Sequence, residues 1–412
     1  MHLFVKLKNE RNFVFSRFIS STIAFGVLHT SLICCVLIQY FKDYGMLPMQ
    51  LSIIIISKRV LRLFCDTSFG LIFDRFGAKV VFILGRLLKL ISYFILLFYP
   101  NFIGFVVAML LDGASYSSIY GKISSYIYNN LSVRKKLKLF PKAMSLYYFC
   151  MDATVAMMTF FAAILLKTHG YDMVIYISIL TNVFSIALLI KFVPGKQNEE
   201  LLEYRSNSFK DIFSTLKTVV KTKPQFVYLI GMYGVVSFLA WQFHSISSLI
   251  LLDMGVSSVN LAMYGACLKT TMGIGAIVSM FFFSKGASLY SCAGFLLLNL
   301  LFGEFSAIVY NKYFFYVFCL LIVLSYTAIE VSIEKNFEYF SDKTIRGTAI
   351  SLAMTFCSFI SIFSNFLVGI IAQKFNYRFA LIVLLSILIC FTAFLMIRFW
   401  QNSVLVKKYE RI

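Results

Sequence analysis

Two basic residues deep inside apolar stretches are the first candidates for chemistry. Arg59 and Lys269 each stand about half way along an apolar run that is long enough to cross a bilayer, and they are 210 positions apart. A charge at that depth costs several kcal/mol unless it meets a partner or a wet cavity. Two cations across a cavity would suit an anionic ligand. Alternatively, each cation pairs with an acid and only fixes packing, as Arg62 and Asp66 can at i and i+4.

Two acidic residues lie at a similar depth. Asp112 and Asp152 are ten or eleven residues from the nearer end of their apolar runs. Either carboxyl could take up and release a proton as a cavity changes sides, so both are candidates for proton coupling, and Asp112 is also a candidate substrate contact. The sequence leaves permanent pairing with a basic residue equally open, the possible partners being Arg59, Lys89 and Lys122.

A third group of candidates belongs to the first and seventh apolar runs. His29 and His244 lie in these runs but are 215 positions apart, so they do not share the spacing of Arg59 and Lys269. A histidine on an apolar face is more often a satisfied core residue than a ligand. Trp241 and Gln242, beside His244, are expected to line a cavity together with His29.

Composition decides which class of protein positions these residues. The chain of 412 residues is 60% hydrophobic and 14% charged, whereas a soluble domain carries about a quarter charged residues. The 38 Lys and Arg against 18 Asp and Glu stand in short clusters between apolar runs, which is typical of membrane proteins and argues against nucleic-acid binding. The nine cysteines and four histidines show no metal-ligand spacing, and no phosphate-binding loop or nucleophile motif occurs, so we expect neither a cofactor nor an enzyme.

Cutting the chain into apolar stretches of about 20 residues predicts an all-α polytopic membrane protein with twelve spans. Basic residues concentrate in the even-numbered loops and at both ends of the chain, which predicts cytoplasmic termini. We expect an N-terminal six-helix bundle over 1–193, a cytoplasmic linker with an amphipathic helix over 194–224, and a C-terminal six-helix bundle over 225–412. The predicted spans are 18–41, 48–72, 79–99, 102–127, 142–166, 171–193, 225–252, 259–283, 287–310, 313–335, 347–372 and 377–400.

An internal repeat relates the two halves. Asp43-Tyr44-Gly45 is matched by Asp253-Met254-Gly255, and Ser115-Tyr116 by Ser325-Tyr326, both at an offset of 210. Further matches follow in the same order at 206 to 210. Many transporter folds carry such repeats, so the repeat predicts two pseudo-symmetric bundles with a binding site between them.

The segment between the second and third spans, Gly70-Leu71-Ile72-Phe73-Asp74-Arg75-Phe76-Gly77-Ala78-Lys79, resembles the Gly-x-x-x-Asp-Arg-x-Gly-x-Lys signature of the major facilitator superfamily. It stands in the second cytoplasmic loop, where that family has it. The resemblance implies a latch in which Asp74 meets the N-terminus of the eleventh span in the outward-facing state. The residues assigned to this latch are Gly70, Asp74, Arg75, Gly77, Lys79 and Arg346.

The sequence departs from the drug and proton antiporters of that superfamily. These usually carry an Arg in span four before a Gly, where this chain has Met109 ahead of Asp112 and Gly113. We therefore expect a secondary transporter in the cytoplasmic (inner) membrane of a bacterium that moves a small organic anion by alternating access. Proton-coupled efflux of a drug or metabolite is the alternative, followed by a transport-dead receptor or scaffold. Membrane lipid, the small-molecule substrate and possible coupling protons are the expected partners.

Overall fold

The computed structural model describes residues 32–119, 122–123, 126–127, 140–193, 224–239, 243–282, 289–309, 311–340 and 346–409. These residues are almost all helical, and no strand occurs among them. The prediction of an all-α fold is confirmed. In the N-terminal half the helices are α3 (Leu32–Asp43), α4 (Pro48–Phe76), α5 (Ala78–Phe98), α6 (Phe102–Ile119) and α8 (Phe140–Phe192). In the C-terminal half they are α10 (Pro224–Phe238), α11 (His244–Asp253), α12 (Ser258–Phe282), α13 (Leu289–Ile308), α14 (Lys312–Phe340), α15 (Arg346–Lys374) and α16 (Tyr377–Tyr409).

Most predicted spans coincide with these helices, and two boundaries differ. Helix α8 contains both the fifth and the sixth predicted span and reverses direction at Gly170, whose φ of 75° is outside the helical range. The seventh predicted span is divided into α10 and α11, and Leu239 and Phe243 between them are π-helical. Residues 1–31, and all of the expected linker except Pro224, lie outside the described part of the chain.

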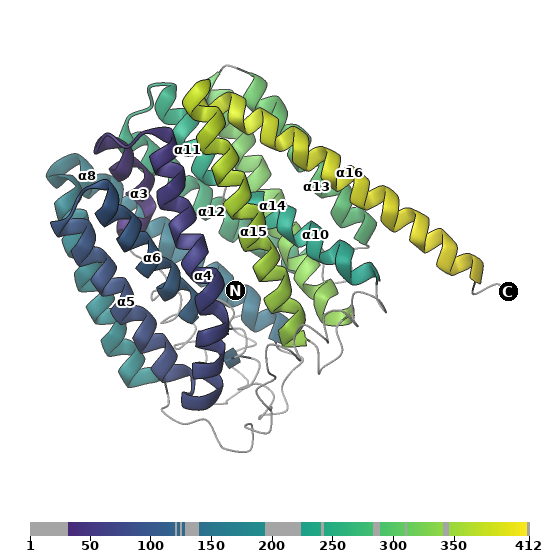
Figure 1. The fold of residues 1–412 in the computed structure, drawn as a ribbon, viewed down its shortest axis with the longest axis horizontal. Coiled ribbons are helices and arrows are strands. Elements are labelled where there is room, and N and C mark those ends of the chain that lie inside the picture. The colour runs from purple at the N-terminus through teal and green to yellow at the C-terminus, as the bar shows by residue number, and fades with distance from the viewer. Residues whose placement is uncertain are drawn as a thin grey trace.

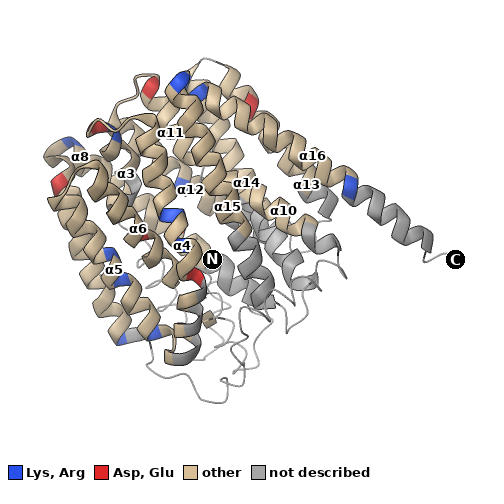
Figure 2. Ribbon diagram, viewed as in Figure 1, with Lys and Arg blue, Asp and Glu red and all other residues tan. Residues whose placement is uncertain are grey.

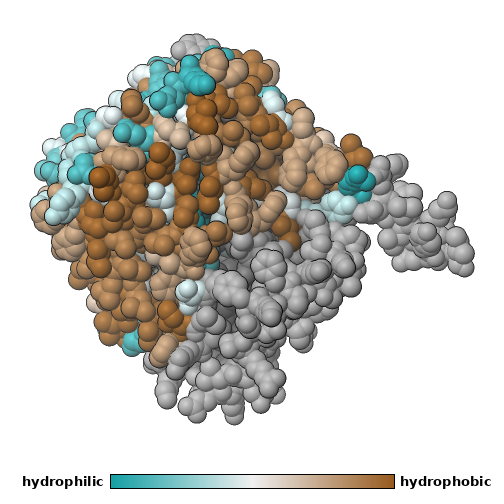
Figure 3. All heavy atoms as spheres, viewed as in Figure 1, coloured by the Kyte–Doolittle hydropathy of each residue, from teal (hydrophilic) through white to brown (hydrophobic). Residues whose placement is uncertain are grey.

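The helices form one bundle, in which α16 is inclined to helices such as α15 and α5 (Figure 1). The two halves meet along two helix pairs, α4 with α15 and α8 with α12. Within the described residues, five helical stretches are long and apolar enough to cross a membrane: Ala78–Phe98, Phe102–Ile119, Tyr147–Lys191, Phe356–Lys374 and Tyr377–Arg398. The surface is brown with apolar side chains over most of the described part of the face that Figure 3 shows. Among the exposed apolar side chains of the molecule, Phe64 is 67% exposed and Leu180 is 66% exposed. Because water would solvate such a surface poorly, it is suited to lipid.

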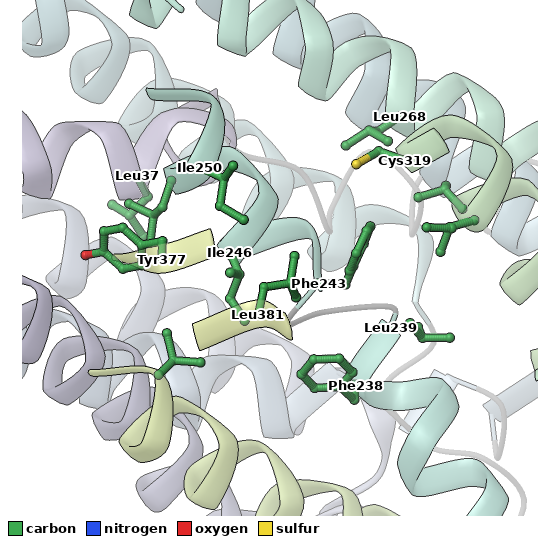
Figure 4. Close-up of a cluster of buried hydrophobic side chains, with 14 of the residues drawn as sticks. Leu37, Phe238, Leu239, Phe243, Ile246, Ile250, Leu268, Cys319, Tyr377 and Leu381 are labelled. Atoms are coloured by element: carbon green, nitrogen blue, oxygen red, sulfur yellow. The ribbon is translucent and has the colours of Figure 1, made fainter. Parts of the chain in front are cut away.

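The apolar core connects the two halves near the turns that contain Gly45 and Gly255; we call this the Gly45 end of the molecule. Leu37 of α3 lies close to Ile250 of α11 and Tyr377 of α16 in the core cluster shown in Figure 4. Figure 2 shows charged residues at the Gly45 end and others further along the described helices, for example on α4 and α5. The charged residues within the helices include the candidate site residues.

Candidate transport site

The strongest electrostatic feature of the described membrane core is a carboxylate held by two lysines. Asp112 on α6 is 3% exposed. Its Oδ2 lies 2.6 Å from Lys58 Nζ on α4, and its Oδ1 accepts a short hydrogen bond from Lys89 Nζ on α5. Neighbouring Gly113 makes this possible, since a Cβ there would overlap the backbone carbonyl oxygen of Lys58. The glycine therefore lets α4 and α6 approach at the depth where the charges meet.

An aromatic ring extends this positive cluster. Tyr116, one turn after Asp112, has Lys58 Nζ 5.4 Å and Arg62 Cζ 4.7 Å from its ring centroid. Arg62 Nε also lies 3.5 Å from Asp66 on the same helix, at the spacing that the sequence suggested for a structural pair. Lys58, Arg62 and Asp66 follow one another at i, i+4 and i+8, so this face of α4 is charged for two turns.

A second ion pair connects the two halves of the molecule. Lys269 Nζ on α12 lies 3.8 Å from Asp152 Oδ1 on α8, and it also lies 3.2 Å from the sulfur of Met272. Asp152 is 3% exposed, whereas the Lys269 side chain is 18% exposed. Among the described residues, no donor makes a hydrogen bond to Asp152 Oδ1. The pair is therefore both looser and less supported than the one at Asp112.

The two basic residues selected from the sequence have different surroundings. Lys269 has Asp152 as its partner, while Arg59 is half-buried on α4 next to Lys58, the residue that contacts Asp112. Sequence reasoning missed Lys58 because it selected residues by the repeat offset, and one residue along a helix turns the side chain by about 100°. The spacing of Lys58 with Arg62 and Asp66 was the signal that could have identified it.

The seventh span contributes a histidine beside this second pair. His244 begins α11 directly after the π-helical Phe243, and Lys269 acts on it electrostatically. Its buried Nδ1 has no hydrogen-bond partner among the described residues. Single π-helical turns occur often at functional sites, because they leave a backbone carbonyl without its regular partner. The other expected cavity residues, His29, Trp241 and Gln242, lie outside the described part of the chain.

The turn that carries the signature has the expected glycine geometry. Gly77 separates α4 from α5 with a φ of 83°, a value that favours glycine. Lys79 Nζ donates a hydrogen bond of 2.8 Å to the carbonyl oxygen of Ile190 near the C-terminus of α8, where the helix dipole favours a cation. The latch itself stays a prediction, because the surroundings of Gly70 and the side chains of Asp74, Arg75 and Arg346 lie outside the described part of the structure.

At the Gly45 end the two halves are in direct contact. Lys42 of α3 lies 2.7 Å from Asp253 of α11, although both side chains are more than 30% exposed. Asp43 accepts a short hydrogen bond from Tyr171 and one of 3.5 Å from Ser258 of α12. Nearby, α15 packs against α4 without a gap: a Cβ at Gly369 would lie 2.7 Å from that of Ser52. This end of the molecule is therefore closed.

The internal repeat is visible in the packing, but its chemistry differs between the halves. Gly45 and Gly255 have φ values of 78° and 77° at equivalent turns. In the first half, Lys89 bonds to Asp112 between α5 and α6, and the equivalent helix pair in the second half is α13 with α14. Asn299 makes a short neutral hydrogen bond with Ser325 between α13 and α14. The same helix contact is thus ionic in the first half and neutral in the second.

Comparison with known proteins places this architecture in a family. A curated relative, an uncharacterized transporter from Buchnera aphidicola subsp. Schizaphis graminum, is 25% identical over 142 residues, which is 34% of this chain and about a third (35%) of that protein. The solved structure of the nucleoside transporter NupG aligns with a TM-score of 0.66 at 14% identity, over 94% of this chain and 99% of that one. A bacterial homologue of the human lysosomal transporter Spinster, inward-facing and occupied, aligns with a TM-score of 0.68 at 13% identity, over 94% and 95%.

At these identities the structural matches show a shared fold. The family model of the Major Facilitator Superfamily matches residues 14–356, which is most of the sequence. The chain belongs to the major facilitator superfamily.

Proposed function

We propose that this multi-pass membrane transporter carries a small organic anion by alternating access. The observation behind this proposal is an excess of positive charge within the described spans of the N-terminal half and at Lys269. Counting residues at least five positions from the ends of the predicted spans, seven basic residues face three acidic ones in these described spans, Asp66, Asp112 and Asp152. The seven are Lys58, Arg59, Arg62, Arg86, Lys89, Lys122 and Lys269.

The excess has an energetic meaning in a membrane. A charge placed near mid-bilayer costs about 3 kcal/mol or more, so an anionic ligand that enters the site is favoured by the net positive charge already there. Arg59 and Lys269 occupy equivalent places in the two halves, on helices that take part in the contact between them. A ligand held by both cations would have one contact from each moving half.

The orientation of the protein in the membrane follows from the distribution of basic residues among the loops. The Gly45 end carries few basic residues, so we assign it to the outside and both termini to the cytoplasm. With the Gly45 end closed, the site would open toward the cytoplasm. The latch around Asp74 would then form only after the halves rock to the opposite, outward-facing state.

Thermal stability of the detergent-purified protein tests this function, because a ligand stabilises the state that it binds. The panel contains lactate, benzoate and succinate as anions, choline as a cation, and glucose as a neutral solute. An anion at a hundred times its Kd should stabilise the protein by about 2.7 kcal/mol. Arg59→Ala and Lys269→Ala should abolish this effect, while Lys312→Ala, which removes an exposed lysine at the start of α14, should not.

Proton-coupled export of a cationic or neutral metabolite is the second candidate, and the weakly supported carboxyl of Asp152 favours it. Stabilisation by choline or glucose that depends on Asp112 or Asp152 would support that candidate. If no anion stabilises the protein, or if both alanine variants respond like the parent, the anion proposal is wrong.

A further inference from the structure

The ion pair between Asp152 and Lys269 crosses from one half of the molecule to the other. We propose that an anion displaces Asp152 from Lys269 and that Asp152 then takes up one proton, so that a monovalent anion and a proton are carried together without net charge. This inference rests on the proposed function, and it identifies both the coupling ion and the residue that carries it.

Asp152 is suited to this exchange, and Asp112 is not. Asp112 has two ammonium groups at hydrogen-bonding distance, so its negative charge is held from both sides. Asp152 is equally buried, but it has one ammonium group at 3.8 Å and no hydrogen bond to its Oδ1 among the described residues. A buried carboxylate with so little support is expensive, and protonation removes the cost once the cation turns away.

The charged and titratable groups around Asp152 leave Lys269 as its counter-ion. On α8 itself, Tyr147 interacts electrostatically with Asp152, and Arg86 of α5 and Tyr116 of α6 also act on Tyr147. From α12 the interacting group is Lys269, which also acts on His244 of α11.

Helix α3 also packs against α8, but no charged group of its described residues acts on Asp152. Loss of Lys269 would therefore leave the carboxylate without a nearby opposite charge among the described residues.

Lys269 is able to change partner. Its side chain is 18% exposed at the contact between α8 and α12. Two of its contacts, a carboxylate oxygen at 3.8 Å and a thioether sulfur at 3.2 Å, are weak for an ammonium group. A substrate carboxylate at hydrogen-bonding distance would be the better partner. In the exchange, one O–H bond forms on Asp152 with a proton from water. The site holds Lys⁺ and Asp⁻ before it, and Lys⁺, the anion and neutral Asp afterwards.

Binding of lactate or benzoate as a function of pH tests the proton uptake. Because one proton enters with each anion, the apparent Kd should rise about tenfold for each pH unit between roughly pH 6 and 8. Calorimetry in two buffers of different ionisation enthalpy should give one proton per anion. Asp152→Asn should bind the anion with less than a twofold change over the same range.

Glu304→Gln is the matched control. It also converts a carboxyl within a predicted span to an amide, but Glu304 bonds to Ser386 between α13 and α16, away from the contact between the halves, so the tenfold slope should stay. Anion binding with no proton uptake, or an unchanged slope in Asp152→Asn, would overturn the inference and leave the proposed function standing. If none of the anions binds, both are wrong.

A measurement without any anion distinguishes a proton-carrying role of Asp152 from a purely structural role. In Lys269→Met the carboxyl should hold its proton in the folded protein, so the melting temperature should fall as the pH rises through the range where that proton is lost. Adding Asp152→Asn to this variant should remove the pH dependence. A flat profile in Lys269→Met would contradict the proposed exchange.

Discussion

At the scale of single residues, Asp112 is a fixed counter-ion. Asp112→Asn would leave the ammonium groups of Lys58 and Lys89 buried without their carboxylate, which should lower stability by roughly 3 to 5 kcal/mol. The melting temperature in detergent measures this loss. Adding Lys89→Met removes one of the two ammonium groups that have lost their carboxylate and should recover part of the lost stability. If Asp112→Asn melts like the parent, the two lysines do not depend on Asp112.

The sequence predicted the depth of these charges but not their partners. Counting residues from the span ends was sufficient to place Asp112 and Asp152 in the membrane core. Partner choice depends on the rotation of each helix and on the distance between helix axes, and at α4 and α6 that distance is set by Gly113. For this reason the sequence left Lys89 as one of three possible partners of Asp112 and did not include Lys58.

At the scale of helices, the closed Gly45 end depends on contacts between the ends of α3, α11 and α12. Lys42→Glu should replace the attraction to Asp253 by repulsion and shift the protein toward the state that is open at this end. Exposed pairs contribute only about 0.5 kcal/mol, so the shift should be two- to fivefold. To measure this shift, Ser52, which is buried against Gly369, is replaced by Cys in a background without native cysteines. The rate at which a water-soluble maleimide labels this cysteine reports how often the Gly45 end is open.

The charge-swapped pair supplies the control for that experiment. Lys42→Glu combined with Asp253→Lys restores opposite charges and should return the labelling rate to that of the parent. Equal rates in all three proteins would mean that the Lys42 contact does not hold the Gly45 end closed.

Helix boundaries were largely predictable, because the length of an apolar run decides them. The prediction of 48–72 and 79–99 is close to α4 and α5, and Gly77 marks the turn between them. The π-helical turn in the seventh span was not predictable. A π-helical turn differs from an α-helix in its backbone hydrogen bonds, which leave no mark in hydropathy.

At the scale of the whole molecule, the fold is symmetric while its charges are not. The repeat gives both halves the same turns and the same helix contacts, yet the ionic contact of the first half is neutral in the second. Among the described residues the first half therefore carries most of the buried charge, and Lys269 is the basic residue that the second half brings to the contact with Asp152. Exchange of that one lysine between a protein carboxylate and a substrate would connect binding to the movement of the two halves.

The contact between Lys89 and Asp112 also bears on how the chain is made. The two residues lie on successive helices joined by the short turn after Phe98, and each alone would add about 3 kcal/mol to the cost of entering lipid. Together they are neutral. During biosynthesis, α5 and α6 should therefore leave the insertion machinery as one hairpin.

In a glycosylation assay of insertion, α5 alone should insert less often than its Lys89→Leu variant, and attaching α6 should remove that difference. Asp112→Asn in the attached α6 should bring the difference back; if it does not, the hairpin is not the unit of insertion. An ion pair that anchors the finished transporter would thus already act while the chain is being synthesised.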